Sequence, residues 1–261
     1  MGAAPFASTA SESGSGWWLR RAADLAESFG LPDKATAGHG TRVISGHGHG
    51  HGDQRPGDRD WAGGHDLATV DGLDGLSIGR LAAELSMSKS GLFAHFGSKQ
   101  DLQLATIEEA RQRYVQEVIQ PALAATAGIR RLHAFCDSFL SYLDRAVFPG
   151  GCFFASAMAE FDAKAPGPVR DRIAECQAQW MDTLERTAAK ARAAGELHAS
   201  SDPQQLAFEL EAALLSANWY YHLYHDPAYL QRARRAVRDR LTSQATPAGL
   251  SSLPPEIQAS Q

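Results

Sequence analysis

Short polar and basic side chains gather in one segment of the sequence, residues 77–99 (SIGRLAAELSMSKSGLFAHFGSK). Hydroxyl and ammonium groups donate hydrogen bonds to phosphate oxygens and to the edges of bases, so the chemistry they offer is recognition of nucleic acid. Arg80, Lys89 and Lys99 stand here against Glu84 alone, which gives 3 − 1 = +2 in a chain whose formal net charge is −5. A local positive charge in an acidic protein is typical of a surface that faces phosphate.

Two short helices are predicted to carry these side chains. Ser77 is a good N-cap, and apolar residues follow it at helical spacing over residues 78–85. Ser88 caps a second helix, in which Leu92 and Phe96 lie four residues apart on one face.

The link between the two helices, residues 86–88, is too short for an antiparallel hairpin. The helices must therefore cross steeply, with Met87 turned inward at the corner, which is helix-turn-helix geometry. Ser88, Lys89 and Ser90 would then be exposed at the start of the second helix, where short side chains allow a helix to enter the major groove of DNA.

The sequence after residue 65 predicts helix after helix and no strand, so the fold class is all-α. Ser98 and Asp101 resemble a capping box and begin a long helix that Pro121 is expected to end. Asp-Pro pairs at 202–203 and 226–227 are strong start signals for the last two helices. Further helices are predicted over residues 129–143, 152–161, 169–195, 202–217 and 226–241.

Length and composition indicate an ordinary globular protein. The 261 residues are 44% hydrophobic and 21% charged, and no apolar run approaches the ~20 residues that cross a bilayer. No membrane partner is expected, and with no signal peptide in view we expect a cytoplasmic protein. Three well-separated cysteines are expected to be buried free thiols.

Residues 1–64 differ from the rest, being rich in Gly, Ser, Ala and His. We expect a disordered extension, and interpret the alternating Gly-His tract at 46–52 as a linker rather than a weak metal site. The helix that should precede the motif contains Gly63 and Gly64, each of which costs about 1 kcal/mol in a helix interior, and has His65 where an apolar residue is expected. One hypothesis is that residues 1–64 are not the native beginning of this domain.

Residues 78–102, and above all SKSGLFAHFGSKQDL at 88–102, resemble the signature of the tetracycline-repressor-like (TetR) family. Residues 148–152 and 202–208 also resemble that family, so the resemblance extends over about residues 66–241. It implies a three-helix helix-turn-helix DNA-binding domain at 65–112 and a larger helical effector-binding and dimerisation domain at 113–243. The tail at 244–261 is rich in serine and proline and is expected to be loose.

The resemblance implies a set of residues that contact DNA: Ser77, Arg80, Ser88, Lys89, Ser90, Phe93, His95 and Lys99. Ser77 and Arg80 would meet phosphate, and His95 and Lys99 would anchor the far backbone. Phe93 stands where the family usually has Tyr, so one phosphate hydrogen bond is lost although the ring can still pack on a sugar.

The family resemblance also implies a cavity for a small, largely apolar effector between the later helices. Core packing is the plain alternative for most of the candidate residues, which are Phe139, Tyr142, Phe154, Met158, Trp180 and Trp219. The last two helices are the expected homodimer surface. The arginines over 232–240 are interpreted as a solvated face beside it, not as a second DNA site.

An enzyme and a small-molecule-binding protein are the two alternatives to a regulator. The sequence contains no catalytic, nucleotide-binding or metal-ligand motif, so no enzyme, cofactor or metal is predicted. The second alternative is a helical small-molecule-binding and dimerisation protein whose DNA binding is impaired by its degenerate first helix. The expected function is a ligand-responsive repressor that binds double-stranded DNA, at a palindromic operator, as a homodimer.

Overall fold

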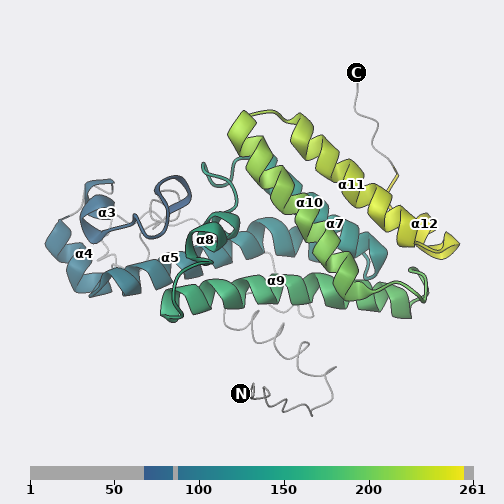
Figure 1. Ribbon diagram of the computed structural model, residues 1–261, viewed down its shortest axis with the longest axis horizontal. Coiled ribbons are helices and arrows are strands. Elements are labelled where there is room, and N and C mark those ends of the chain that lie inside the picture. The colour runs from purple at the N-terminus through teal and green to yellow at the C-terminus, as the bar shows by residue number, and fades with distance from the viewer. Residues whose placement is uncertain (1–67, 85–87, 256–261) are drawn as a thin grey trace, which may run out of the picture. The chain divides into compact units, whose positions relative to one another are not determined.

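The computed structural model describes residues 68–84 and 88–255, and their regular structure is helical throughout (Figure 1). The all-α prediction is therefore confirmed. The 1–64 extension, Met87 and the side chains of Phe93 and His95 lie outside the described residues. The elements are α3 (Ile78–Glu84), α4 (Lys89–Phe96), α5 (Lys99–Tyr114), the π-helix η2 (Val115–Ile119), α6 (Gln120–Leu123), α7 (Ile129–Asp144), α8 (Phe153–Phe161), α9 (Pro168–Ala193), α10 (Pro203–Tyr224), α11 (Ala228–Gln244) and α12 (Pro247–Ser252).

The predicted caps position the N-terminal helices. The Ser77 hydroxyl oxygen accepts a hydrogen bond from Arg80 N at 3.2 Å, and that of Ser98 accepts one from Asp101 N at 3.1 Å. The Ser98 hydroxyl also donates to the Asp101 carboxylate at 2.6 Å. A glutamate would reach the cap backbone N–H in a capping box, and the shorter aspartate takes the hydroxyl instead.

The expectation that Pro121 ends the long helix is wrong. The helix that begins at Lys99 continues through η2 into α6, and Pro121 lies in the first turn of α6. Proline has no N–H to donate back along the helix, so it is tolerated where a turn widens. Gln120 N indeed donates to Val115 O, five residues back, which is the π-type spacing.

The later helices form a bundle around one buried core. In Figure 1, α10 and α11 run side by side with α7 next to them, and α9 packs along α5, α7 and α10. The predicted inward stripe of α7 is buried, as is that of α11; these residues are Ile129, Leu132, Cys136, Phe139, Leu143, Leu230, Ala233, Val237 and Leu241. Asp202 caps α10 as predicted, accepting a hydrogen bond from Gln204 N at 2.9 Å. At α11 the prediction is off by one residue, because Pro227 is the N-cap and Asp226 lies before it, accepting from Ala228 N at 2.9 Å.

The expected loose tail is ordered as far as residue 255. Leu197 and Ala245 form an antiparallel bridge, Thr246 caps α12, and the Leu253 side chain is buried. Serine and proline content suggested a loose chain, but the apolar residues between them bury against the bundle. That burial compensates the entropy of ordering the segment.

All three cysteines are buried free thiols, as predicted. Burial raises the pKa of Cys152 to about 11, so its thiol is protonated at neutral pH and unreactive. As for membranes, the helices within 68–84 and 88–255 include none with the length and apolarity that spanning a bilayer requires.

Candidate nucleic-acid interface and buried aromatic cluster

The start of α4 presents three side chains to solvent. Ser88, Lys89 and Ser90 are all exposed, as the sequence predicted. Lys89 lies across the corner from Gly79 of α3, where a Cβ atom would approach its Cε to 3.7 Å. Lys89 forms no ion pair with any described side chain. The ammonium group at this corner is thus available to an external anion.

The other two basic residues of the segment are already paired. Arg80 Nη2 lies 2.5 Å from Asp71 Oδ2, and Lys99 Nζ lies 3.1 Å from Asp74 Oδ1. Hydrogen bonds from Lys164 and Lys99 lower the pKa of Asp74 to about 2, so its carboxylate stays ionised at neutral pH. A phosphate that contacts Arg80 or Lys99 must therefore replace a carboxylate.

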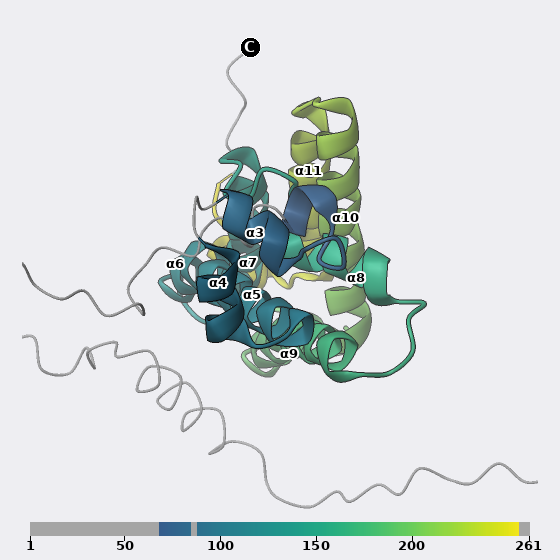
Figure 2. The same cartoon turned by 90° about the vertical axis from the view of Figure 1, so that its left-hand side faces the viewer.

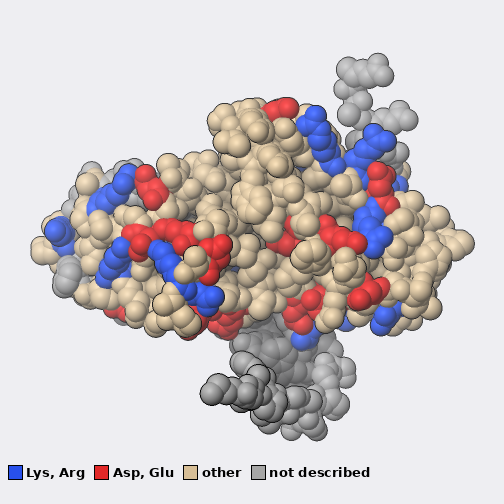
Figure 3. Space-filling view, in the orientation of Figure 1, with Lys and Arg blue, Asp and Glu red and all other residues tan. Residues whose placement is uncertain are grey.

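This pairing changes the charge balance inferred from the sequence. With Asp71 and Asp74 included, the segment 71–99 has three basic and three acidic residues, so 3 − 3 = 0. Figure 3 shows red and blue side chains interspersed around α3, α5 and α8 rather than one blue face. The excess of +2 over residues 77–99 leaves out Asp71 and Asp74. The fold brings these two acidic side chains to the same surface as Arg80 and Lys99.

A glutamate on α8 holds the segment that carries these two aspartates. Glu160 Oε2 accepts a hydrogen bond from Leu73 N at 2.7 Å, and Oε1 accepts one from Asp74 N at 2.8 Å. Gly72 has φ +84°, and a Cβ there would come within 2.9 Å of Glu160 Oε1. Glycine thus meets both a backbone requirement and a close approach at this turn.

A second contact joins the same two parts of the chain. Gly150, in the loop before α8, donates its backbone N–H to Thr69 Oγ1 at 3.2 Å. Ala68 and Thr69 are buried, whereas Val70 is 65% exposed. Together, α8 and the loop before it fix the entry to the helix-turn-helix.

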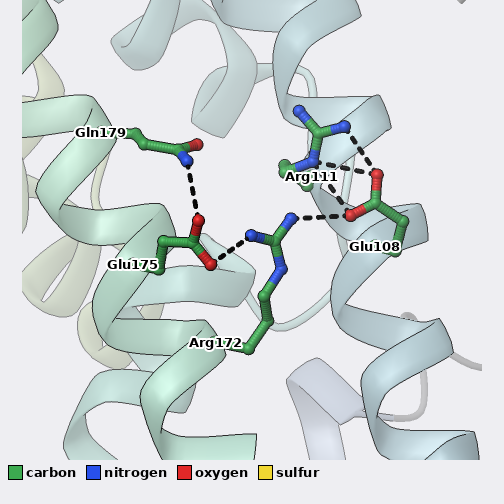
Figure 4. Close-up of polar contacts among 5 residues, drawn as sticks. All are labelled: Glu108, Arg111, Arg172, Glu175 and Gln179. Atoms are coloured by element: carbon green, nitrogen blue, oxygen red, sulfur yellow. Dashed lines mark hydrogen bonds and ion pairs between the residues drawn. The ribbon is translucent and has the colours of Figure 1, made fainter. Parts of the chain in front are cut away.

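An ion-pair network fixes α5 to α9 (Figure 4). Arg172 donates to Glu108 at 2.9 Å and to Glu175 at 2.7 Å, and Arg111 donates to both oxygens of Glu108. Burial tends to raise the pKa of Glu108, but the hydrogen bonds from Arg111 and Arg172 outweigh burial and lower it. The long helix that follows α4 is thereby anchored in the bundle.

Five of the six predicted effector residues lie in one buried region. Tyr114 is its centre: its ring centroid lies 6.4 Å from that of Phe139, 5.9 Å from Tyr142, 5.8 Å from Phe154 and 5.5 Å from Trp180, all in edge-to-face arrangements. We call these five rings the aromatic cluster. Met158 of α8 is partly buried and packs against the same core.

Trp219 does not belong to the aromatic cluster, which corrects the sequence-based assignment. Its side chain is 51% exposed on α10, because it lies two residues beyond the buried Ala217 and turns to the outer face. Exposed apolar side chains continue that face along α10: Phe208, Trp219, Tyr220, Leu223 and Tyr224. The rings of Tyr220 and Tyr224 stack on Tyr229 of α11 at 5.2 and 5.6 Å, and on each other at 6.0 Å.

Two residues of this buried region were not among the predicted effector residues, Tyr114 and Glu211. Glu211 is 8% exposed, and its oxygens accept hydrogen bonds from Trp180 Nε1 at 2.6 Å and Gln177 Nε2 at 3.0 Å. The available signal was spacing, since Glu211 lies four residues after Ala207 and three before Leu214, on the buried face of α10.

The arginines of α11 are engaged within the chain. Arg234 pairs with Asp137, Arg240 with Glu209, and the Arg232 guanidinium lies 4.7 Å above the Tyr229 ring. These contacts are consistent with a solvent-facing surface on α11. They also neutralise part of the positive charge that nucleic acid would need there.

Comparison with known proteins gives matches over both parts. Residues 62–106 match the family model for bacterial regulatory proteins of the tetR family, and residues 128–237 match that for the tetracyclin repressor-like C-terminal domain. Together the two matches cover more than half of the chain. A search of curated proteins finds no match.

Solved structures of similar fold include several transcriptional regulators. A TetR transcriptional regulator from Chloroflexus aurantiacus is 25% identical, with a TM-score of 0.66 over 71% of this chain and 93% of its own. A TetR-family regulator from Streptomyces coelicolor is 21% identical, with a TM-score of 0.60 over 71% and 94%. AibR, solved in complex with isovaleryl coenzyme A and operator DNA, is 19% identical, with a TM-score of 0.52 over 71% and 97%.

Proposed function

The chain belongs to the tetR family of DNA-binding bacterial regulators, and from that premise we propose that it is a ligand-responsive repressor that binds a palindromic operator as a homodimer. The observation that carries the proposal is the exposure of Ser88, Lys89 and Ser90 at the start of α4. A helix that presents short polar residues and one long cation at its N-terminal end suits the major groove.

On DNA, each residue of the predicted contact set has a distinct role in this proposal. Lys89 contacts a base edge or a phosphate near the groove, and Ser88 and Ser90 flank it. Arg80 and Lys99 contact the backbone after phosphate has replaced Asp71 and Asp74. Exposed ion pairs are worth ~0–1 kcal/mol, so the exchange is inexpensive. Ser77, Phe93 and His95 complete the contacts to the backbone.

The homodimer is supported by the outer face of α10. Phe208, Trp219 and Leu223 are more than half exposed on one helix, beside the tyrosine stack of Tyr220, Tyr224 and Tyr229. Contiguous apolar surface of this kind marks a protein interface. A two-fold axis at α10 and α11 would set two copies of α4 against successive major grooves.

The effector site is proposed in the aromatic cluster around Tyr114. AibR, a structural neighbour, was solved in complex with isovaleryl coenzyme A and operator DNA, so that protein binds a ligand as well as DNA. For the present chain we propose a small, largely apolar effector, because rings supply most of the cluster.

Binding to DNA can be tested with fluorescently labelled fragments of the region upstream of the protein's own gene. We expect specific binding that weakens as salt rises, with Lys89→Ala reducing the slope of log K against log salt by about 1. Lys190→Ala is the matched control, since Lys190 is exposed on α9, away from α3 and α4. Ligand binding without any salt-dependent DNA binding would instead support the small-molecule-binding alternative.

A further inference from the structure

Glu211 is a buried carboxylate without a cation. None of the described Lys, Arg or His side chains forms an ion pair with it. Each of its two oxygens accepts a hydrogen bond, one from Trp180 and one from Gln177, so both act as acceptors, as in an ionised carboxylate. A buried charge ordinarily has a partner of opposite charge, because its desolvation is expensive.

One of the two donors to this carboxylate is aromatic. Trp180, which donates to it, also packs edge-on against Tyr114 at 5.5 Å and Phe135 at 6.0 Å. Trp180 thus joins the Glu211 carboxylate to the aromatic cluster. Aromatic faces with a carboxylate among them are what organic cations bind.

A second buried polar group belongs to the aromatic cluster itself. The Tyr142 hydroxyl is buried and has no hydrogen-bond partner among the described residues. A buried hydroxyl without a partner costs free energy, so it points to a group that the chain itself does not supply. The aromatic cluster therefore includes one unpartnered hydroxyl, and through Trp180 it adjoins the Glu211 carboxylate.

We propose that the effector of this regulator is an apolar organic cation, an amine whose charge pairs with Glu211 and whose apolar body lies among the rings around Tyr114. The proposal rests on the proposed ligand-responsive function and narrows its effector to one chemical class. The same carboxylate disfavours an anionic effector, because a second negative charge at this site would be repelled in a low dielectric.

The experiment uses three probes with one carbon skeleton: 4-phenylbutylamine, 4-phenylbutan-1-ol and 4-phenylbutyrate. Binding to the full-length protein is measured by quenching of tryptophan fluorescence, because Trp180 lies in the cluster, and by the shift in melting temperature. We expect the amine to bind about tenfold more tightly than the alcohol, the gain of one charge-assisted hydrogen bond, and the carboxylate not to bind.

Two variants assign the preference to one carboxylate. In Glu211→Gln the amide can still accept from Trp180, and the Gln177 amide can turn to match it, so the fold is retained while the amine and the alcohol bind equally. In Glu209→Gln, which removes the same charge two residues away on α10, the preference for the amine is retained. An amine that binds wild-type protein no more tightly than the alcohol overturns the proposal, as does a preference that survives Glu211→Gln.

Failure of this inference is distinguishable from failure of the proposed function. Operator binding that is released by the alcohol or the carboxylate but not by the amine leaves a ligand-responsive regulator and overturns the cationic effector. Amine binding that depends on Glu211 but leaves operator affinity unchanged supports the cation site, and contradicts the ligand-responsive repressor.

Discussion

The three basic side chains of residues 77–99 differ in their surroundings, and under the proposed function this difference would decide how each acts on DNA. Lys89 is exposed without an ion pair to a described side chain, whereas Arg80 and Lys99 each hold an aspartate. When phosphate replaces Asp71 or Asp74, the displaced carboxylate stays close to the duplex and repels it. The two aspartates should therefore lower DNA affinity while leaving the contacts themselves in place.

Asp71→Asn tests this balance on the simpler of the two pairs. We expect operator affinity to rise about two- to fivefold at 0.1 M salt, because one like charge near the phosphates is removed. Fluorescence anisotropy with the labelled operator measures the change. Asp182→Asn, which removes a charge from the Arg186 pair on α9, is the control and should have no effect. An unchanged affinity in Asp71→Asn would mean that Arg80 does not face phosphate.

Tyr142→Phe addresses the orphan hydroxyl of the aromatic cluster. Removing a buried hydroxyl that has no partner should raise the free energy of unfolding of the unliganded protein by about 1 kcal/mol, since the desolvation cost disappears while the ring packing stays. Urea denaturation followed by circular dichroism measures it, with Tyr229→Phe in the exposed stack as control. A loss of stability would instead reveal a bound water or another partner at that hydroxyl.

For single residues, the sequence predicts contacts between positions that lie close together along the chain. Ser77, Ser98 and Asp202 were identified as caps because a cap and the backbone N–H that donates to it lie within a few residues. Glu160 could not be identified, because its partners Leu73 and Asp74 lie more than 80 residues away and carry no matching charge. Backbone N–H groups are the same in every sequence, so a carboxylate that binds them leaves no complementary signal.

Among the described elements, α8 contacts both the segment that enters the helix-turn-helix and the aromatic cluster, and α5 does so as well, through Lys99 and Tyr114. Phe154 lies in the cluster and Glu160 holds the 73–74 backbone, so the two residues are separated by six positions, about 9 Å along a helix axis. α8 also packs against α9. A short helix that makes both contacts can carry a displacement from one to the other.

Glu160→Gln tests whether α8 transmits that displacement. An amide keeps one acceptor for the two N–H groups of Leu73 and Asp74, so the turn at 72–75 should loosen. We expect amide hydrogen exchange to speed up about tenfold over residues 69–77, with no change over α7, which serves as the internal reference. Asp162→Asn at the exposed end of the same helix is the matched control.

The same variant has a functional consequence for the regulator. Ligand that releases the operator from wild-type protein should release it from Glu160→Gln severalfold less, while operator affinity without ligand changes little. Equal release in both proteins would show that the signal does not pass through Glu160.

The sequence predicts the helices well where a start signal or an apolar stripe is clear, and less well at Pro121. Asp-Pro pairs and apolar stripes located α7, α10 and α11. Pro121 was interpreted as a stop because proline breaks regular helices, yet the chain accommodates it by a single π-type turn. The segment from 244 to 255 was predicted to be loose because of its serines and prolines. It is ordered instead, because apolar residues such as Leu253 are buried against the bundle.

For the whole molecule, the division into a reading part and a helical bundle could be anticipated, but its electrostatics could not. Net charge over a stretch of sequence ignores acids that folding brings beside it, as Asp71 and Asp74 show. Surface exposure has the same limit: Trp219 was assigned to the interior from residue type, and the fold places it on the outer face of α10. That correction strengthens the case for an interface, because it adds a large ring to the apolar face.

Trp219→Glu and Leu223→Glu test the homodimer through that face. In a two-fold interface each substitution occurs twice, so two unpaired charges would be buried, which costs several kcal/mol. We expect the protein to change from the mass of two chains to that of one in light scattering. Leu123→Glu is the control, since Leu123 is half-exposed on α6, on the other side of the bundle from α10 in Figure 2.

Loss of the dimer should also change DNA binding in a way that loss of folding would not. A single chain has one reading head, so operator affinity should fall at least about a hundredfold and the slope of log K against log salt should halve. Circular dichroism and the melting temperature should stay close to those of Leu123→Glu. If Trp219→Glu and Leu223→Glu remain dimeric with an unchanged salt slope, the two-fold axis does not lie at α10, and another surface must pair the reading heads.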